Sequence, residues 1–449
     1  MSISNNKKYQ YFLFFILSIS TLFNGGNSNL FIQINFVLLG ILFLQCKKNK
    51  NYNLHLRNFL QQNNLSLIFY FLFIIYLLLQ IVPLPIEFLK FMALEKYNIL
   101  NSLNINIKYS SISLSYSDSF FQILNYLSII LIIFILKMIF FSERHKRRLY
   151  IFLSFLGFLS SLVAVMLYLL GNPEILFFKN EFYKDSSTGF FINRTVFSIF
   201  LLFCFLSSIE LLKNFRHINS NSEKNLFFDR IYIRLFLMFI TIGIITSFSR
   251  IGNFLLLFTI TFYLLNEIFV SKKKDKTFIF TILLIVFFDL LIFGFYFGAT
   301  ELINRFYFLD EELSTINNSS ANITRGQIII FSFNQLNEFL FFGYGSGAYE
   351  TMFQLKFLNS DNKFADHAHS DIIEFFGEFG LVGFIILFFS VTKFFSNIRN
   401  YTFTNSILFF YLIIILLFDF SLHIPLIQML FIIFFSISNN SNYKINFRS

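Results

Sequence analysis

Long apolar blocks dominate the sequence and restrict its fold more than any other feature. The blocks are roughly 15–22 residues long, and short basic or polar stretches separate them. A helix rises about 1.5 Å per residue, so a block of this length crosses the roughly 30 Å hydrocarbon core of a bilayer. Charged residues make up only 13% of the 449 positions, about half the fraction usual in soluble domains. The chain is therefore predicted to be an all-α, polytopic transmembrane helical bundle.

About twelve spans are predicted, with edges uncertain by a few residues. They are roughly 10–23, 30–45, 65–82, 120–140, 149–170, 190–212, 231–247, 251–270, 277–298, 380–396, 402–418 and 422–437. The first block is short and follows Lys7 and Lys8, as a signal peptide would. No small-residue cleavage site comes after it, which favours a retained first helix.

Lysine and arginine are concentrated on one side of the predicted membrane bundle. About two thirds of the 35 lie in the loops after the even-numbered spans or near the two termini. Cytoplasmic loops carry such an excess, so both termini are predicted to be cytoplasmic. The net charge of +10 comes largely from these loops, so it indicates contact with membrane lipids and not with nucleic acid.

This orientation divides the chain into three parts. Residues 1–298 hold spans 1–9, residues 299–379 form a large periplasmic loop, and residues 380–449 hold spans 10–12 and a cytoplasmic tail. A loop as long as 299–379 usually carries function. No nucleotide-binding motif is present, and Cys46 and Cys204 offer neither a disulfide framework nor metal-ligand spacing.

Three arginines lie on the predicted periplasmic side of the membrane, where the excess of basic residues in cytoplasmic loops does not account for them. Arg194 lies at the outer end of span 6, Arg250 in the tight link between spans 7 and 8, and Arg325 in the large loop. Each could be a snorkelling side chain that binds lipid phosphate. Three together favour a functional role, because the planar guanidinium donates two parallel hydrogen bonds to a phosphate.

The densest titratable cluster is Asp366-His367-Ala368-His369-Ser370-Asp371 in the large loop. One interpretation is a general base, since imidazole titrates near neutral pH. Another is a metal site, because His-x-His flanked by aspartates can coordinate zinc or manganese. The third is a polar helix start, with Ser370 or Asp371 as the cap.

Glycines gather at Gly343-Tyr344-Gly345-Ser346-Gly347 in the same loop. The run lacks the lysine and the serine or threonine of a P-loop. It is interpreted as a turn in which the backbone, at Gly345 and Gly347, approaches a ligand closely.

These elements together resemble the O-antigen ligase family. From His369 to Gly380 the spacing is similar to the family's histidine signature, which is a histidine, a polar residue, two variable positions, an aliphatic residue, six variable positions and a glycine. The family also has an outward Ser-Arg-x-Gly, as in 249–252, and a loop arginine before a Gly-x-Gly-x-Gly run, as in Arg325 and 343–347. Weaker similarities at 80–85, 189–194 and 419–425 follow in the same order, so the resemblance covers roughly residues 65–437.

The resemblance implies a glycosyltransferase in the bacterial inner membrane with its active site facing the periplasm. The donor would be a glycan on undecaprenyl diphosphate, and the acceptor a sugar hydroxyl on lipid A–core or on a second lipid-linked glycan. Arg250 and Arg325 would act on the diphosphate and His369 as the base, while Arg194, Gly345, Gly347 and His367 would bind substrate. No cofactor or metal is expected, and direct attack would invert the anomeric centre.

Two alternatives stay open at this point. An O-antigen polymerase shares the architecture and differs only in its acceptor. A transporter of a small anion is the other, but it should place charged residues within spans near the midplane, and only Asp289 clearly lies within a predicted span.

Overall fold

The computed structural model describes most of the chain. The described residues are 2–102, 104, 107–173, 183–214, 223–271, 276–292, 325–357, 365–397 and 402–438. Two parts of the predicted large loop, 299–324 and 358–364, therefore lie outside the described residues.

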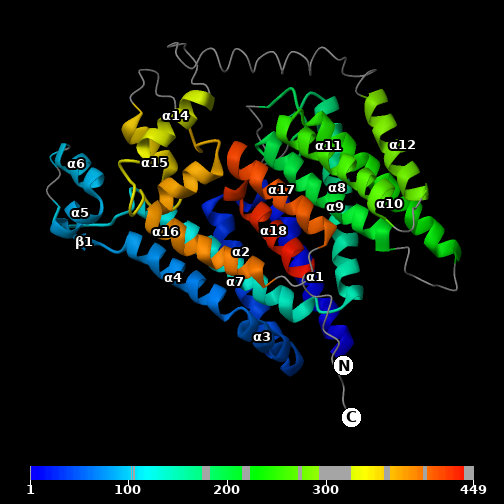
Figure 1. The fold of residues 1–449 in the computed structure, drawn as a ribbon, viewed down its shortest axis with the longest axis horizontal. Coiled ribbons are helices and arrows are strands. Elements are labelled where there is room, and N and C mark those ends of the chain that lie inside the picture. The colour runs from blue at the N-terminus through cyan, green and yellow to red at the C-terminus, as the bar shows by residue number, and fades with distance from the viewer. Residues whose placement is uncertain are drawn as a thin grey trace.

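The described chain is all-α, as predicted, apart from one two-residue antiparallel ladder between β1 (Leu84–Pro85) and β2 (Tyr109–Ser110) (Figure 1). The helices in the first half are α1 (Ser2–Leu22), α2 (Asn29–Lys47), α3 (Lys50–Gln62), α4 (Asn64–Ile81), α5 (Ile86–Met92), α6 (Leu94–Ser102), α7 (Tyr116–Ile139), α8 (Glu143–Leu169) and α9 (Arg194–Asn214). Those in the second half are α10 (Glu223–Thr246), α11 (Arg250–Leu265), α12 (Lys276–Ile292), α14 (Arg325–Gln335), α15 (Tyr349–Lys356), α16 (Asp371–Ser396), α17 (Phe403–Phe418) and α18 (Pro425–Ser438). Short helical turns η1 (Asn24–Gly26), η3 (Asn266–Val270) and η6 (Ser421–His423) complete the set.

Seven of the described helices are long and apolar enough to cross a membrane, which confirms a multi-pass membrane protein. They are α2, α4, α7, α8, α9, α11 continued by η3, and α16. The other predicted spans coincide with α1, α10, α12, α17 and α18, of which α17 and α18 are shorter apolar helices. The number of seven applies to the described residues, and the count of about twelve stays a prediction.

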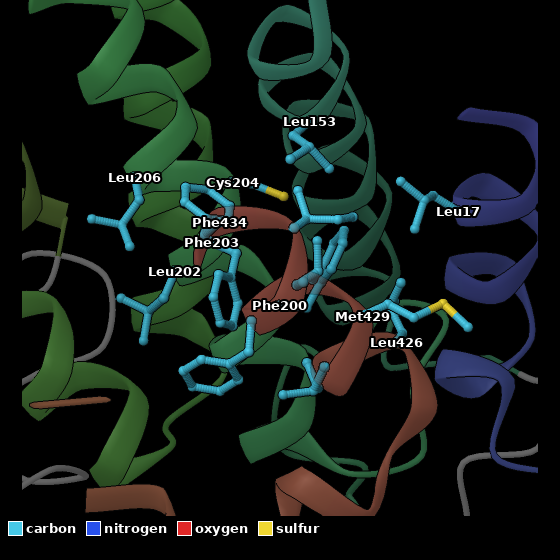
Figure 2. Close-up of a cluster of buried hydrophobic side chains, with 14 of the residues drawn as sticks. Leu17, Leu153, Phe200, Leu202, Phe203, Cys204, Leu206, Leu426, Met429 and Phe434 are labelled. Carbon is cyan, nitrogen blue, oxygen red and sulfur yellow. The ribbon is translucent and has the colours of Figure 1, made fainter. Parts of the chain in front are cut away.

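Helix α9 lies at the centre of the bundle, since 89% of its apolar stretch is buried inside the structure. A helix that is apolar all round is stable only where neighbours cover every face. Phe200, Phe203 and Cys204 of α9 lie among leucines of α1 and α8 and residues of α18 (Figure 2). Close approach needs small residues at the contact, and a Cβ on Gly157 of α8 would lie 2.3 Å from the Cβ of Cys204.

Helix α16 begins nine residues before the predicted tenth span and is broken at Gly380 (φ 62°, ψ −177°). A side chain at Gly380 would collide with the backbone of Phe341 and Gly343, because the glycine-rich turn packs into the break. The Tyr76 hydroxyl and the Gln80 amide of α4 donate hydrogen bonds to carbonyl oxygens on both sides of this contact, at Phe342, Glu378 and Phe379. The break thereby holds the first turns of α16 in a fixed direction.

Several inter-helix connections meet at this end of the bundle. The backbone N–H of Ile192, before α9, donates to Asn24 in η1 across 2.9 Å, and a Cβ on Gly25 would lie 2.5 Å from Ile424, before α18. The distribution of lysine and arginine predicts which helix ends face the periplasm. These ends include the starts of α2, α7, α9, α16 and α18.

Candidate active site

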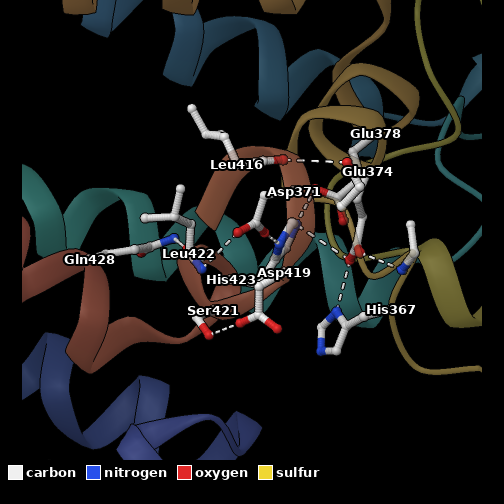
Figure 3. A network of polar contacts seen from close by, with 12 residues as sticks. His367, Asp371, Glu374, Glu378, Leu416, Asp419, Ser421, Leu422, His423 and Gln428 are labelled. Carbon is white, nitrogen blue, oxygen red and sulfur yellow. Dashed lines mark hydrogen bonds and ion pairs between the residues drawn. The ribbon is translucent and has the colours of Figure 1, made fainter. Parts of the chain in front are cut away.

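Three buried carboxylates of α16 converge on one histidine from η6 (Figure 3). Asp371, Glu374 and Glu378 are spaced three and four residues apart, which places them on one face of a helix. All three are at most 1% exposed, and His423 is 3% exposed. The His423 Nδ1 lies 2.5 Å from Asp371 Oδ1, while its Nε2 lies 3.4 Å from Glu374 Oε1 and 3.6 Å from Glu378 Oε2.

The charge of His423 follows from these neighbours. Burial by itself lowers the pKa of the imidazole, but the Glu374 charge and the hydrogen bond to Asp371 oppose it, and the net pKa lies well above 6.5. The protonated ring therefore offsets part of the negative charge that α16 buries. His423 Nε2 and Glu378 Oε2 have no hydrogen-bond partner among the described residues.

His367 is held by the same carboxylates. Its Nδ1 lies 2.8 Å from Glu374 Oε1, and the other oxygen of Glu374 accepts the Ala368 backbone N–H at 2.8 Å. The imidazole stacks on the Phe420 ring, with centroids 4.3 Å apart. A carboxylate that fixes one ring nitrogen orients the other, so Nε2 of His367 is the nitrogen available to a ligand.

His369 has a different environment. Its backbone is left-handed (φ 57°), an uncommon conformation outside glycine that often marks a functional segment. Burial, followed by the positive charge of Arg325, lowers the pKa of His369 to about 3, so the ring is neutral with a free lone pair at pH 7. The positive charge of Arg325 thus acts on His369, so these two predicted site residues lie within electrostatic range of each other.

Both histidines precede α16, in an irregular segment that ends at Ser370. Ser370 occupies the cap position but makes no capping hydrogen bond; its hydroxyl donates to the Leu416 carbonyl. The predicted metal set of Asp366, His367, His369 and Asp371 is not assembled, because Asp371 bonds to His423. Ligand atoms of His367, Glu374 and His423 instead lie within 4.8 Å of one another and are the described group that could hold a cation.

Two adjoining cavities open at these residues. The first, of about 590 Å³, is lined by His369, Phe420 and residues at the starts of α9 and α14, among them Tyr183, Asn193 and Ile328. The second, of about 360 Å³, is lined by Glu374, Glu378, His423 and residues of α2, α7 and α15. Asn27, Asp366 and His367 line both, so His367 stands where the cavities join.

The three predicted arginines share one structural feature, since each is the first residue of a described helix: α9, α11 and α14. Helix N-termini favour anions because their first backbone N–H groups are unpaired. The Arg194 guanidinium lies over the Tyr183 ring, 5.2 Å from its centroid, at the edge of the first cavity. Arg250 follows the cap Ser249, and α11 and α9 begin side by side, because a Cβ on Gly252 would lie 2.4 Å from that of Ser198. None of the three arginines is among the described residues that line either cavity.

The glycine-rich turn packs closely against protein at all three of its glycines. A Cβ on Gly343 would lie 2.2 Å from the Glu378 carbonyl oxygen, and one on Gly345 would lie 2.5 Å from the Ser113 Cβ. Gly347 lines the second cavity, and its N–H donates to Glu378 Oε1 across 2.7 Å. The turn thus forms part of the wall of the second cavity, and Gly347 is the member that lines it.

Sequence reasoning missed the carboxylates that organise the site. Glu374 and Glu378 carry a detectable signal, because acidic residues spaced by four on one face of an apolar helix are costly unless they have partners. His423 was seen only within a weak similarity at 419–425. Its pairing with α16 depends on a tertiary contact across about 50 positions, which no local pattern reports.

Comparison with known proteins supports the family assignment. Residues 235–388 match the family model described as O-Antigen ligase. The match runs from within α10 to within α16 and contains Arg250, Arg325, the glycine-rich turn, His369 and the carboxylates of α16. Curated proteins give no significant match.

Proposed function

Residues 235–388 match the O-antigen ligase family model, and on that premise we propose that the chain is a membrane glycosyltransferase that transfers a glycan from undecaprenyl diphosphate to a sugar hydroxyl at the periplasmic membrane face. Lipid A–core is the proposed acceptor, and a second lipid-linked glycan is the acceptor if the protein is a polymerase. The observation that carries the proposal is the position of neutral His369 beside Arg325, within the family-matched segment and on a cavity wall.

The chemistry needs little beyond these residues. A new bond forms between the acceptor oxygen and the anomeric carbon as the bond from that carbon to the diphosphate oxygen breaks, and the diphosphate leaves with the electron pair. The hydroxyl proton passes to His369. Direct displacement inverts the anomeric centre. A diphosphate is already a good leaving group, so the scheme requires no metal and no nucleotide; Arg250 and Arg325, with Arg194 as a third, hold the phosphates.

The low pKa of His369 suits an ordered mechanism. Burial and then the positive charge of Arg325 lower the pKa of His369, which disfavours an imidazolium, so the ring is a weak base. A diphosphate bound at Arg325 brings negative charge that offsets the guanidinium and raises the basicity of His369. The base would therefore become effective once the donor is bound.

The remaining predicted residues are assigned to substrate binding. His367 and Gly347 line the second cavity, His367 lines the first as well, and Arg194 lies at the edge of the first. Gly345 contributes by shaping the turn against Ser113.

The direct test is transfer by purified protein with a lipid-linked donor and either lipid A–core or a second lipid-linked glycan. His369→Ala should lower the rate by about 10²- to 10⁴-fold, the usual contribution of a general base. His367→Ala should be milder, and donor binding should survive both changes, because the arginines hold the diphosphate. The preferred acceptor then separates ligase from polymerase.

Two results would contradict this assignment. Full activity in His369→Ala would remove the histidine from the chemistry. Loss of wild-type activity in EDTA, restored by a divalent metal, would replace the base with a metal centre at His367, Glu374 and His423.

One observation bears on the transporter alternative. Helix α16 is broken and buries carboxylates, as helices at transporter ion sites do. The carboxylates Glu374 and Glu378 that precede the break, however, line the second cavity together with His367, which lies in the segment that matches the family model. Uptake of a small anion by sealed vesicles, without glycan transfer, would favour the transporter.

A further inference from the structure

The second cavity is strongly acidic. Its lining includes five carboxylates: Asp118, Glu350, Asp366, Glu374 and Glu378. Glu374 and Glu378 form the buried floor with His423, whereas Glu350 and Asp366 are exposed at the rim. Burial and the neighbouring charges of Asp366 and Asp118 raise the pKa of Glu350, which shows that the rim carboxylates repel one another.

The floor holds a loosely paired carboxylate and imidazole. Glu378 and His423 line the cavity, and Oε2 of the one forms an ion pair of 3.6 Å with Nε2 of the other, too long for a hydrogen bond. A ligand hydroxyl suits this pair, because its hydrogen can bond to the carboxylate while its oxygen accepts from the imidazolium. The amides of Asn27 and Gln122 on the same wall can bond further hydroxyls. The volume of about 360 Å³ lies near the lower end of small-ligand pockets, which suits a single sugar.

Charge separates the two cavities into different roles. The described lining of the first cavity has one carboxylate, Asp366, against five in the second, and its His369 lies within the electrostatic range of Arg325, so an anionic diphosphate is better tolerated on that side. The same diphosphate would be repelled from the carboxylates of the second cavity. His367, Asp366 and Asn27 line both, so a sugar in the second cavity lies next to the reacting centre.

Resting on the proposed function, we infer that the second cavity is the subsite for the acceptor sugar, and that it takes an uncharged or amino-substituted sugar and rejects one with a carboxylate or phosphate. Neutral hydroxyls satisfy the floor atoms without adding charge. A negatively charged substituent would meet five carboxylates in a confined space, so the cavity discriminates by repulsion as well as by contact.

The test compares two acceptors that differ at one group. Purified protein receives the same donor and an equimolar mixture of oligosaccharide acceptors ending in a hexose or in the corresponding hexuronic acid. We expect the wild type to prefer the hexose by about tenfold or more, as repulsion between like charges predicts. The double variant Glu350→Gln/Asp366→Asn, at the exposed rim, should lower that preference several-fold while the protein stays folded. Glu87→Gln, an exposed carboxylate on α5 outside the described cavity lining, is the matched control and should leave it unchanged.

Binding of the free oligosaccharides, measured by saturation-transfer NMR, separates this inference from the proposed function. Selective binding of the hexose form without any transfer would keep the subsite and refute the transferase. Equal transfer to both acceptors, or an unchanged preference in the rim variant, would refute the subsite and keep the transferase. Discrimination that EDTA abolishes and a divalent metal restores would show a cation site and overturn the sugar assignment.

Discussion

His423 Nδ1 and Asp371 Oδ1 lie 2.5 Å apart and join the turn before α18 to the first residue of α16. The same carboxylate accepts the Leu422 backbone N–H at 2.9 Å through its other oxygen. Asp371 therefore fixes both the ring and the backbone of η6, and the position of the Glu374–His367 pair depends on it.

The first prediction concerns this pair and pH. The pKa of His423 is raised above its ordinary value of 6.5, so its stabilising contribution is complete below 6.5 and is lost as pH rises through the folded value. The unfolding temperature of the wild type in detergent should therefore fall on the alkaline side of neutrality. Asp371→Asn should cost about 3–5 kcal/mol, as breaking a buried ion pair does, and should flatten that alkaline fall. If the unfolding temperature fell equally with pH in the wild type and in Asp371→Asn, the pair would not be its cause. Glu87→Gln, an exposed carboxylate on α5, is the control and should keep the profile of the wild type.

The second prediction concerns the basicity of His369. Burial and then Arg325 lower its pKa to about 3. Arg325→Gln removes the second cause only, so the pKa should rise but stay below 6.5, the ordinary value. Labelled-histidine NMR titration, assigned with His369→Gln, measures it. Adding a short polyprenyl diphosphate to the wild type should likewise raise the pKa of His369. A pKa of His369 that neither the substitution nor the diphosphate changes would contradict the ordered mechanism.

A third prediction tests how the arginines act. Arg250→Lys and Arg325→Lys should each lose most transfer activity at near-normal protein level, because lysine keeps the charge but not the paired hydrogen bonds. Transfer rate and membrane protein level are measured together. If both lysine variants keep full activity, the arginines supply general charge or lipid anchoring.

The fourth prediction is the orientation in the membrane. Reporter fusions at Asn51, Lys146 and Lys274 should report cytoplasm, and fusions at Ser117 and Asn318 should report periplasm; 274 and 318 lie outside the described residues. The membrane helices that contribute to the site, among them α9, α16 and α18, all begin at ends that the charge distribution predicts to face the periplasm. A cytoplasmic reporter signal at Asn318 would remove the site from the lipid-linked donor and end the proposed function.

The sequence determined the membrane character and the helical class, and it carried the resemblance to the O-antigen ligase family that the match over residues 235–388 supports. Apolar length alone decides whether a helix can cross a bilayer, and ordered motifs such as 249–252 and 369–380 are visible in one dimension. It also indicated Arg325 and His369 as partners in one site, although only their spacing within the family pattern suggested it.

Tertiary structure decided how the site is assembled. The break at Gly380 exists because the turn at 343–347 packs against it, and that break directs Glu374 and Glu378 toward His423 from another part of the chain. A buried charge is tolerated only where a partner meets it, and that partner is fixed by packing and not by local sequence. For the same reason the division into a first cavity with one carboxylate and a second with five could not be predicted, since each wall combines residues from helices far apart in the chain.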